Sequence, residues 1–218
     1  MFSSCKRLKN LAATFPKVTS AYSLCSYCDK LETISLSLPE VTNFSYAFEA
    51  CPMLKDVYLD LDKLQSVSAP FGSVGNSTKN LESVTLNAPL LKSVSNMFEG
   101  KKKLTSFKGD LSSLTSGYAM FSGCNKLTSF DAELPSLSTA DSMFSGCNLD
   151  AESCAKIFGS LPKYTSGSHK MDIRVQVSAV DTIEEVLGLR KGEIDKTATV
   201  WRPYIAKGWT FYISISND

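Results

Sequence analysis

The chain has 218 residues, of which 43% are hydrophobic and 21% are charged, and its formal net charge at pH 7 is +1. This length accommodates one elongated domain, or a repeat domain with a small appended one. The near balance of acids and bases argues against nucleic-acid binding, which needs a basic patch or stripe. No apolar stretch reaches the length of a transmembrane helix.

A motif of Phe, three residues later Cys, and three further on Leu recurs along the chain with a period of 23 residues. A fixed period of this length predicts a solenoid, in which each coil buries its apolar side only against its neighbours. The closing position is Leu8, Leu31, Leu54, Leu81, Leu104 and Leu127, and the opening position is Phe2, Cys25, Phe48, Phe71, Phe98, Phe121 and Phe144. Both series place one four-residue insertion within residues 72–80, where Gly, Asn and Ser predict a loop that bulges from the stack without breaking it.

The segment after each Leu alternates apolar and polar residues, which predicts a half-buried strand. Proline then ends the strand at Pro16, Pro39, Pro89 and Pro135. The three-residue spacing of Phe, Cys and Leu predicts a short helical turn. Each coil is therefore expected to contain a strand, a corner, a short extended segment and a helical turn, with about six and a half coils in residues 1–148.

These repeats resemble the leucine-rich repeats of the BspA-like type, which occur in bacterial surface proteins and in some protists. The resemblance is carried by the strand leucines, by the pairs Met97 and Phe98, Met120 and Phe121, and Met143 and Phe144, and by Cys5, Cys28, Cys51, Cys124 and Cys147. It implies an α/β leucine-rich-repeat solenoid with a parallel β ladder. It also implies a role in adhesion and protein interaction, and an extracellular or cell-surface location.

The recurring cysteines occupy one position of the coil, so we expect a buried ladder of free thiols. Parallel Cβ vectors in such a ladder do not suit a disulfide. Cys25 and Cys28 form a C-x-x-C pair, but no second ligand pair or nearby histidine supports a zinc site, and we expect no metal and no cofactor. The run Lys101, Lys102 and Lys103 is interpreted as a solvated corner rather than a phosphate site.

Residues 149–218 are expected to form a small α/β cap of helix, strand, helix and strand. The first helix should begin at Asn148 or Asp150 and end near Gly159. A strand is predicted for residues 171–177, helix for residues 181–207 with a kink or break at Pro203, a helix C-cap at Gly208, and a last strand from Trp209.

The aromatic residues of this segment are interpreted as a cap core rather than a sugar-stacking surface; they are Trp201, Tyr204, Trp209, Phe211 and Tyr212. The segments from Leu161 to Gly167 and from Ala206 to Thr210 resemble the tails of repeat proteins from Bacteroides-type gut bacteria and their phages or mobile elements. That resemblance implies a possible place in a phage tail or appendage.

The outward positions of the strands are the candidate binding residues, and they are Tyr58, Asp60, Thr85, Asn87, Lys108, Asp110, Asp131 and Glu133. A partner could present Lys or Arg opposite the carboxylates of Asp110, Asp131 and Glu133, since charge complementarity directs specificity. The alternative interpretation is a solvated sheet that simply carries polar residues.

No catalytic motif is apparent, and we expect no enzymatic activity. His169 is the single histidine and is interpreted as a solvated turn residue. Asp131 and Glu133 could form the carboxylate pair of a glycan hydrolase, but a strand ladder offers a flat surface rather than a pocket.

The favoured hypothesis is a non-catalytic binding or adhesion module for a protein or glycan partner at a cell or virion surface. The alternative is a structural spacer or an assembly component of a larger surface or phage-appendage protein. No signal peptide is visible, and no polar capping coil precedes Met1, so upstream sequence, a partner or self-association is expected to cover the first coil.

Overall fold

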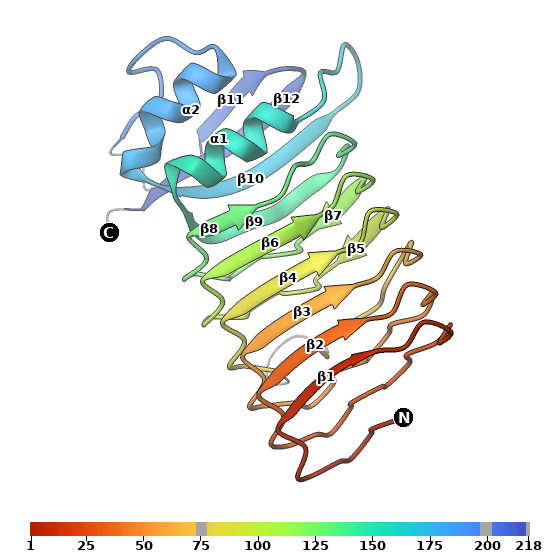
Figure 1. The fold of residues 1–218 in the computed structure, drawn as a ribbon. Helices are drawn as coiled ribbons and strands as arrows, with labels where there is room; N and C mark the ends of the chain where they lie inside the picture. Colours follow the sequence, from red (N-terminus) through yellow and green to blue (C-terminus); the bar gives the residue numbers. More distant parts are fainter. Residues whose placement is uncertain (73–77, 197–201, 217–218) are drawn as a thin grey trace.

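The computed structural model describes residues 1–72, 78–196 and 202–216, and shows a solenoid with a C-terminal cap (Figure 1). Each coil contributes one strand to a six-stranded sheet: β1 (Asn10–Thr14), β2 (Thr33–Ser37), β3 (Asp56–Asp60), β4 (Ser83–Asn87), β6 (Ser106–Asp110) and β8 (Ser129–Asp131). All pairings are parallel and join equivalent positions of consecutive coils, as Ile34 with Val57. The predicted solenoid and its parallel ladder are confirmed.

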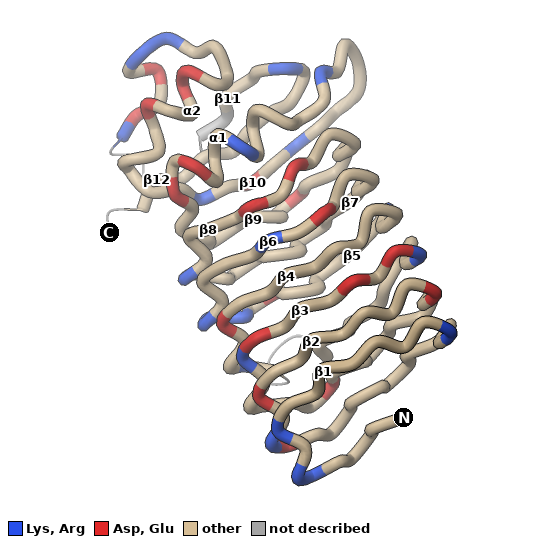
Figure 2. Tube along the Cα trace, in the orientation of Figure 1, with Lys and Arg blue, Asp and Glu red and all other residues tan. Residues whose placement is uncertain are grey.

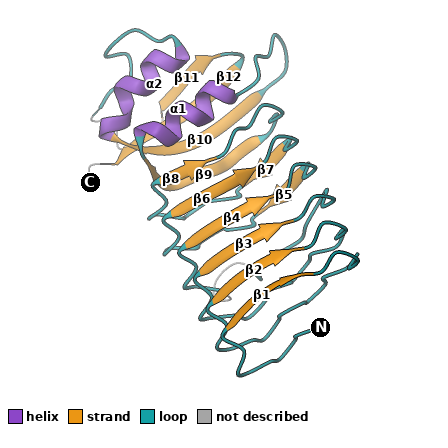
Figure 3. Ribbon diagram, in the orientation of Figure 1, coloured by secondary structure: helices purple, strands orange, loops and turns teal. Residues whose placement is uncertain are grey.

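A second ladder follows the corner of each coil (Figure 3). It contains β5 (Ser93–Ser95) and β7 (Ser116–Tyr118), with single bridges from Ser20 to Asn43, from Ser66 to Ser93 and from Ser116 to Thr139. The last coil continues into the long strand β9 (Ala140–Leu149), which joins the cap. The apolar side chains of the coils, such as Leu59 and Val94, are buried in the core.

The Phe-Cys-Leu segments form tight turns, so the predicted helical turn is wrong. Among the described residues, left-handed backbone recurs at two positions of the coil, two residues before and two residues after the Phe position. The first set is Ser23, Tyr46, Ala69, Asn96, Ala119 and Ser142, and the second is Ser4, Tyr27, Ala50, Gly100, Gly123 and Gly146. A right-handed helical turn needs consecutive right-handed residues, and these positions interrupt them.

The phenylalanines that open the motif stack along the axis of the solenoid. Ring centroids lie 5.7 Å apart for Phe48 and Phe71, 5.1 Å for Phe71 and Phe98, and 5.2 Å for Phe98 and Phe121. The insertion falls between Phe71 and Phe98, yet their rings remain neighbours, and β3 pairs with β4 over all five positions. The stack is therefore continuous across the insertion, as the spacing predicts.

The cysteines of the repeat are free thiols, and all except Cys5 are buried. Each buried thiol donates to a backbone carbonyl of the preceding coil, as Cys51 Sγ does to Cys25 O at 3.1 Å and Cys124 Sγ to Phe98 O at 3.0 Å. Burial raises the pKa of Cys51 and Cys124 to about 12. Cys5, on the first coil, is exposed, which corrects the prediction of a fully buried ladder.

Lys101 occupies the cysteine position of its coil and is only 3% exposed. Its Nζ donates to the carbonyl of Phe71 at 3.4 Å, and the hydroxyl of Thr78 donates to the same carbonyl at 3.0 Å. Burial lowers the pKa of Lys101 to about 8. The predicted solvated corner is wrong for Lys101, whereas Lys102 and Lys103 are exposed.

The cap contains α1 (Ala151–Ser160), β10 (His169–Gln176), a 3-10 turn at Val177–Ala179, α2 (Val180–Leu187), β11 (Arg202–Ala206) and β12 (Trp209–Ser216). Its sheet has the order β11-β12-β10-β9. Asp150 is the N-cap of α1, and its carboxylate accepts from the N–H of Ser153 at 2.9 Å. The described part of the chain contains no helix that is long and apolar enough to cross a membrane.

The second predicted helix of the cap is only partly correct. Helix α2 ends at Leu187, and residues 202–206 form an antiparallel strand with β12. Pro203 is tolerated because β11 lies at the edge of its sheet, where one N–H side is unpaired. Lys207 and Gly208 form the left-handed turn between these strands, so Gly208 is not a helix C-cap. Trp201 lies outside the described residues.

The cap covers the end of both ladders. Strand β10 pairs with β9 and continues the second ladder, while α1 packs against β8 at the end of the six-stranded sheet. The buried aromatics Trp209 and Phe211 form part of the cap core, and Phe158 of α1 meets Phe211 at 5.0 Å between ring centroids. Trp209 Nε1 donates to Pro162 O at 3.1 Å.

Candidate binding face

The outward side of the six-stranded sheet is here called the sheet face. Its middle row contains Ala12, Ser35, Tyr58, Thr85, Lys108 and Asp131, which are paired in register from β1 to β8. The row nearer the strand ends contains Thr14, Ser37, Asp60, Asn87 and Asp110, and Glu133 follows β8. The structure therefore places all the candidate binding residues from the sequence on one surface.

The sheet face is polar, and its charged residues lie on β3 and on the two strands nearest the cap, β6 and β8. Strands β1 and β2 contain no charged residue, whereas β6 carries Lys108 and Asp110 and β8 carries Asp131 (Figure 2). The one large side chain of the middle row without a charge is that of Tyr58, which is 41% exposed. Its neighbours in the row, Ser35 and Thr85, are short, so the ring rises above them.

Hydrogen bonds between side chains order the middle of the sheet face. The phenol of Tyr58 donates to the carboxylate of Asp60, with 3.1 Å to each oxygen, and Asn87 Nδ2 donates to Asp60 Oδ1 at 2.6 Å. The carboxylate acceptor raises the pKa of Tyr58, because the protonated phenol makes this bond. At the start of the same two strands, Ser83 Oγ donates to Asp56 Oδ1 at 2.6 Å.

Asp131 is paired with two lysines from different elements. Lys108 of β6 lies 3.0 Å from one carboxylate oxygen, and Lys156 of α1 contacts the other. The hydrogen bonds from Lys156 and then Lys108 lower the pKa of Asp131, and the same contact raises the pKa of Lys156. Asp131 is therefore already satisfied within the chain, and Asp110 and Glu133 are the exposed carboxylates that a partner meets.

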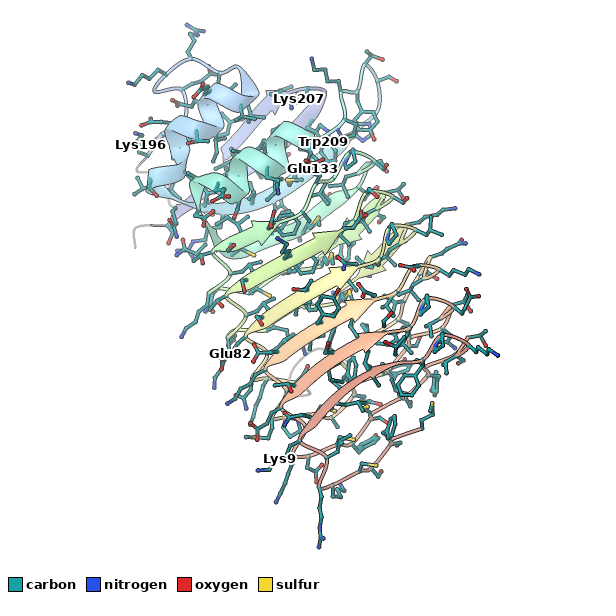
Figure 4. The ribbon with its side chains drawn as sticks, viewed as in Figure 1. Lys9, Glu82, Glu133, Lys196, Lys207 and Trp209 are labelled. Atoms are coloured by element: carbon teal, nitrogen blue, oxygen red, sulfur yellow. The ribbon has the colours of Figure 1, made fainter. Side chains whose placement is uncertain are left out.

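A hollow of about 560 Å³ lies where the sheet face meets the cap. It is lined by Asn87, Lys108, Gly109, Asp110, Leu111, Ser112, Asp131, Ala132, Glu133 and Lys156. Glu133 lies beside the cap, close to α1 (Figure 4). Gly109 replaces the leucine of earlier coils, and a Cβ there would meet Leu86 O at 1.9 Å, so no larger side chain fits this backbone. The expectation of a flat surface without a pocket is thus corrected at this end.

A second hollow, of about 230 Å³, lies at the other end of the sheet face. Its lining includes Tyr58 and short polar side chains such as Thr33, Ser35 and Ser83. Tyr58 thus lies on one hollow and Asn87 on the other, and both side chains bind the same carboxylate, that of Asp60.

Sequence reasoning missed Lys156 as a residue of this surface. The N-cap at Asp150 defines where α1 begins, and its buried residues Ser153, Cys154, Ile157 and Phe158 define its inner side. These positions place Lys156 on the flank of the helix, but the sequence pattern does not indicate that α1 lies against β8. That contact depends on the tertiary arrangement of the cap.

The described residues considered for catalysis, Asp131 and His169, do not have the surroundings that catalysis requires. Asp131 is held ionised, which does not suit the general acid of a glycan hydrolase. His169 stacks on Tyr164, with 3.6 Å between ring centroids, and its Nδ1 lies 2.9 Å from Ser138 O. His169 is thus a packed residue of the cap, and its interpretation as a solvated turn residue is wrong.

Parallel strands stacked one per coil, with ladders of Leu, Phe and Cys behind them, define a leucine-rich-repeat solenoid. The family described as BspA type Leucine rich repeat region matches residues 1–71 and 73–165 in six copies, and the chain belongs to this family. Its members are often surface-associated, and the fold is generally a non-enzymatic binding or scaffold fold. A search of curated proteins and a search of solved structures each found no match.

Proposed function

We propose that the chain is a non-catalytic binding module that presents the sheet face to a protein or glycan at a cell or virion surface. The observation that carries this proposal is the hollow beside the cap, where carboxylate, ammonium, amide and hydroxyl groups converge on one concavity. Binding sites are typically concave surfaces with a few placed polar groups. The continuous Phe stack supports the proposal, because it holds the strands that carry these groups in a fixed register.

Interferometry with the immobilised chain tests this proposal. The probes are mucin, collagen, and soluble neutral and anionic polysaccharides. The diagnostic variant combines Asp110→Ala with Glu133→Ala, since both carboxylates are exposed in the hollow. The matched control combines Asp62→Ala with Glu185→Ala, two exposed carboxylates outside it. We expect the diagnostic variant to weaken binding of a captured probe at least tenfold and the control to leave it unchanged; equal binding by both would contradict the proposal.

A role as a spacer or assembly component is the second candidate. It is favoured by the first coil, at the end of the stack remote from the cap, where Phe2, Leu11 and Phe15 are only partly buried (Figure 1). An apolar surface of this kind can pack against a further coil or a subunit. Multi-angle light scattering of the chain with and without an added polar capping coil distinguishes the roles. Self-association that capping abolishes supports assembly through the first coil, and self-association that survives capping supports assembly through another surface.

A further inference from the structure

The composition of the sheet face narrows the kind of ligand it can bind. From β1 to β8 the outward side chains are hydroxyls, amides, carboxylates, one ammonium, Ala12 and Tyr58. No Leu, Ile, Val, Met, Phe or Trp points outward from these described strands, because those residues lie on the inner side, where all but the partly buried Leu11 are buried. Protein interfaces usually have an apolar, aromatic-rich centre. The sheet face offers little of that and many groups that pair with hydroxyls.

Tyr58 is positioned to stack on a sugar ring. Its phenol is held by Asp60, which restrains the ring, while Ser35 and Thr85 beside it are too short to cover it. The face of an aromatic ring is electronegative, and the C–H groups on one side of a pyranose are weakly positive, so the two surfaces attract and exclude water together. A ring fixed before binding also loses little conformational entropy.

The polar groups around Tyr58 suit sugar hydroxyls. Asp60 binds both the Tyr58 phenol and the Asn87 amide, and Asn87 lines the hollow beside the cap. Carboxylates accept from hydroxyls, and the Asn amide both donates and accepts. The strands that carry these groups are spaced by about 4.8 Å, close to the length of one sugar residue in an extended chain. Consecutive sugars can therefore meet consecutive coils.

Charge selects between classes of glycan. The hollow beside the cap holds the carboxylates of Asp110, Asp131 and Glu133 against the ammonium groups of Lys108 and Lys156, and both lysines pair with Asp131. The exposed carboxylates repel sulfated or uronic-acid chains, and the lysines are not available to offset this without breaking their ion pairs.

We propose that the ligand of the sheet face is an extended neutral oligosaccharide, which stacks on Tyr58 and hydrogen-bonds to Asp60, Asn87 and Asp110. This inference rests on the proposed binding function and names the ligand class for the same surface. The glycan lies across the strands, from the hollow that contains Tyr58 to the hollow beside the cap.

Isothermal titration calorimetry with hexasaccharides from glucan, mannan, xylan and galactan tests the inference, with heparin and polygalacturonate fragments as anionic probes. We expect at least one neutral hexasaccharide to bind, with Tyr58→Ala weakening it tenfold or more and Tyr58→Phe retaining most of the affinity. Tyr118→Ala is the matched control, because Tyr118 is 49% exposed but belongs to β7 in the second ladder. Thermal unfolding of each variant confirms that the fold is kept.

Three results would overturn the glycan assignment: no neutral hexasaccharide binding at millimolar concentration, binding of anionic chains alone, or equal loss on Tyr58→Ala and Tyr118→Ala. A separate arm uses mucin before and after enzymatic removal of its glycans. Binding that survives deglycosylation but is lost in the Asp110→Ala, Glu133→Ala variant would reject a glycan ligand and leave the proposed binding function standing. Binding unaffected by that variant would reject the proposed face itself.

Discussion

The hydroxyl of Ser153 in α1 accepts a hydrogen bond from the backbone N–H of Phe130 in β8, with 2.7 Å between Oγ and N. Ser160, at the other end of α1, accepts in the same way from the N–H of Leu134 at 2.9 Å. Strand β8 ends the six-stranded sheet, and its outer edge would otherwise hold buried donors without partners. The side chains of Ser153 and Ser160 thus accept the hydrogen bonds that the backbone of a further coil would otherwise accept.

Replacing Ser153 with Ala removes the partner of a buried N–H. We expect the free energy of unfolding to fall by about 1–3 kcal/mol, the usual cost of an unsatisfied buried donor. Ser178→Ala is the control, because Ser178 is exposed and its hydroxyl donates to the nearby Gln176 side chain; its effect should stay within about 0.5 kcal/mol. Urea unfolding of both variants measures the difference, and equal midpoints would show that α1 does not satisfy this edge.

The left-handed positions of the turns predict opposite effects for two substitutions. Gly123→Ala should destabilise by about 1 kcal/mol, because an L side chain is strained at φ +73° while the added Cβ would lie an unstrained 3.7 Å from Gly100 Cα. Ala50→Gly, at the same position of an earlier coil with φ 54°, should stabilise by about 0.5 kcal/mol, since relief of strain is partly offset by a more flexible unfolded chain. Thermal unfolding of the pair checks this, and effects of the same sign would refute the argument.

Because Lys101 is buried, the effect of Lys101→Met on the free energy of unfolding should depend on pH. Burial lowers the pKa of Lys101 to about 8 in the folded chain, whereas an unfolded lysine has a value near 10.4. Below pH 8 both states are protonated and the folded state bears the full cost of the buried charge. Between pH 8 and about 10.4 the unfolded state binds more protons, so the wild-type chain gains stability as pH rises.

The Met variant should therefore be more stable than wild type at pH 7, by on the order of 3 kcal/mol at most, and its advantage should shrink above pH 8. Thr78 still donates to Phe71 O in this variant. The difference between the two proteins is the quantity to measure, because ionisation of the unfolded cysteines affects both alike. Chemical unfolding at several pH values gives it, and a constant difference would contradict the buried charge.

Thiol titration with an aromatic disulfide reagent should find one rapidly reacting cysteine in the native chain. Cys5 is exposed, whereas the other cysteines are buried and burial raises the pKa of Cys25, Cys51 and Cys124 to about 12, which suppresses the thiolate. All seven cysteines should react in denaturant. Cys5→Ser should abolish the rapid phase, and rapid labelling that persists in this variant would show that the ladder opens.

The repeat register predicted the strands because each coil has to place the same residues against its neighbours. Alternation around Ile34 and Leu36 identified both the buried side and the outward side, and hence the candidate residues from Tyr58 to Glu133. The turn conformation was not predictable from spacing alone, since Phe and Cys three residues apart fit a helical turn as well as a tight turn with one left-handed residue. Non-glycine residues such as Tyr46 and Ala50 gave no local signal for positive φ.

The cap was harder to predict for a different reason. Ile194 and Ile205 fit one helical stripe, but Ile205 belongs to β11, which pairs with β12, so tertiary pairing decides against the periodicity. The same limit applies to Lys156, whose place beside Asp131 depends on where α1 lies. Lys101 was misread because a lysine run suggests exposure, whereas the repeat register assigns its first member to the core.

The carbonyl of Phe71 accepts bonds from both Thr78 and Lys101, at the point where the insertion begins. Thr78, which follows the insertion, and Lys101, in the next coil, thus bind one backbone atom, while the rings of Phe71 and Phe98 and the strands β3 and β4 keep the spacing of an ordinary coil. Loop length at this corner is therefore decoupled from the geometry of the sheet face. A change of length or sequence between Phe71 and Thr78 should therefore leave the rows of the sheet face aligned.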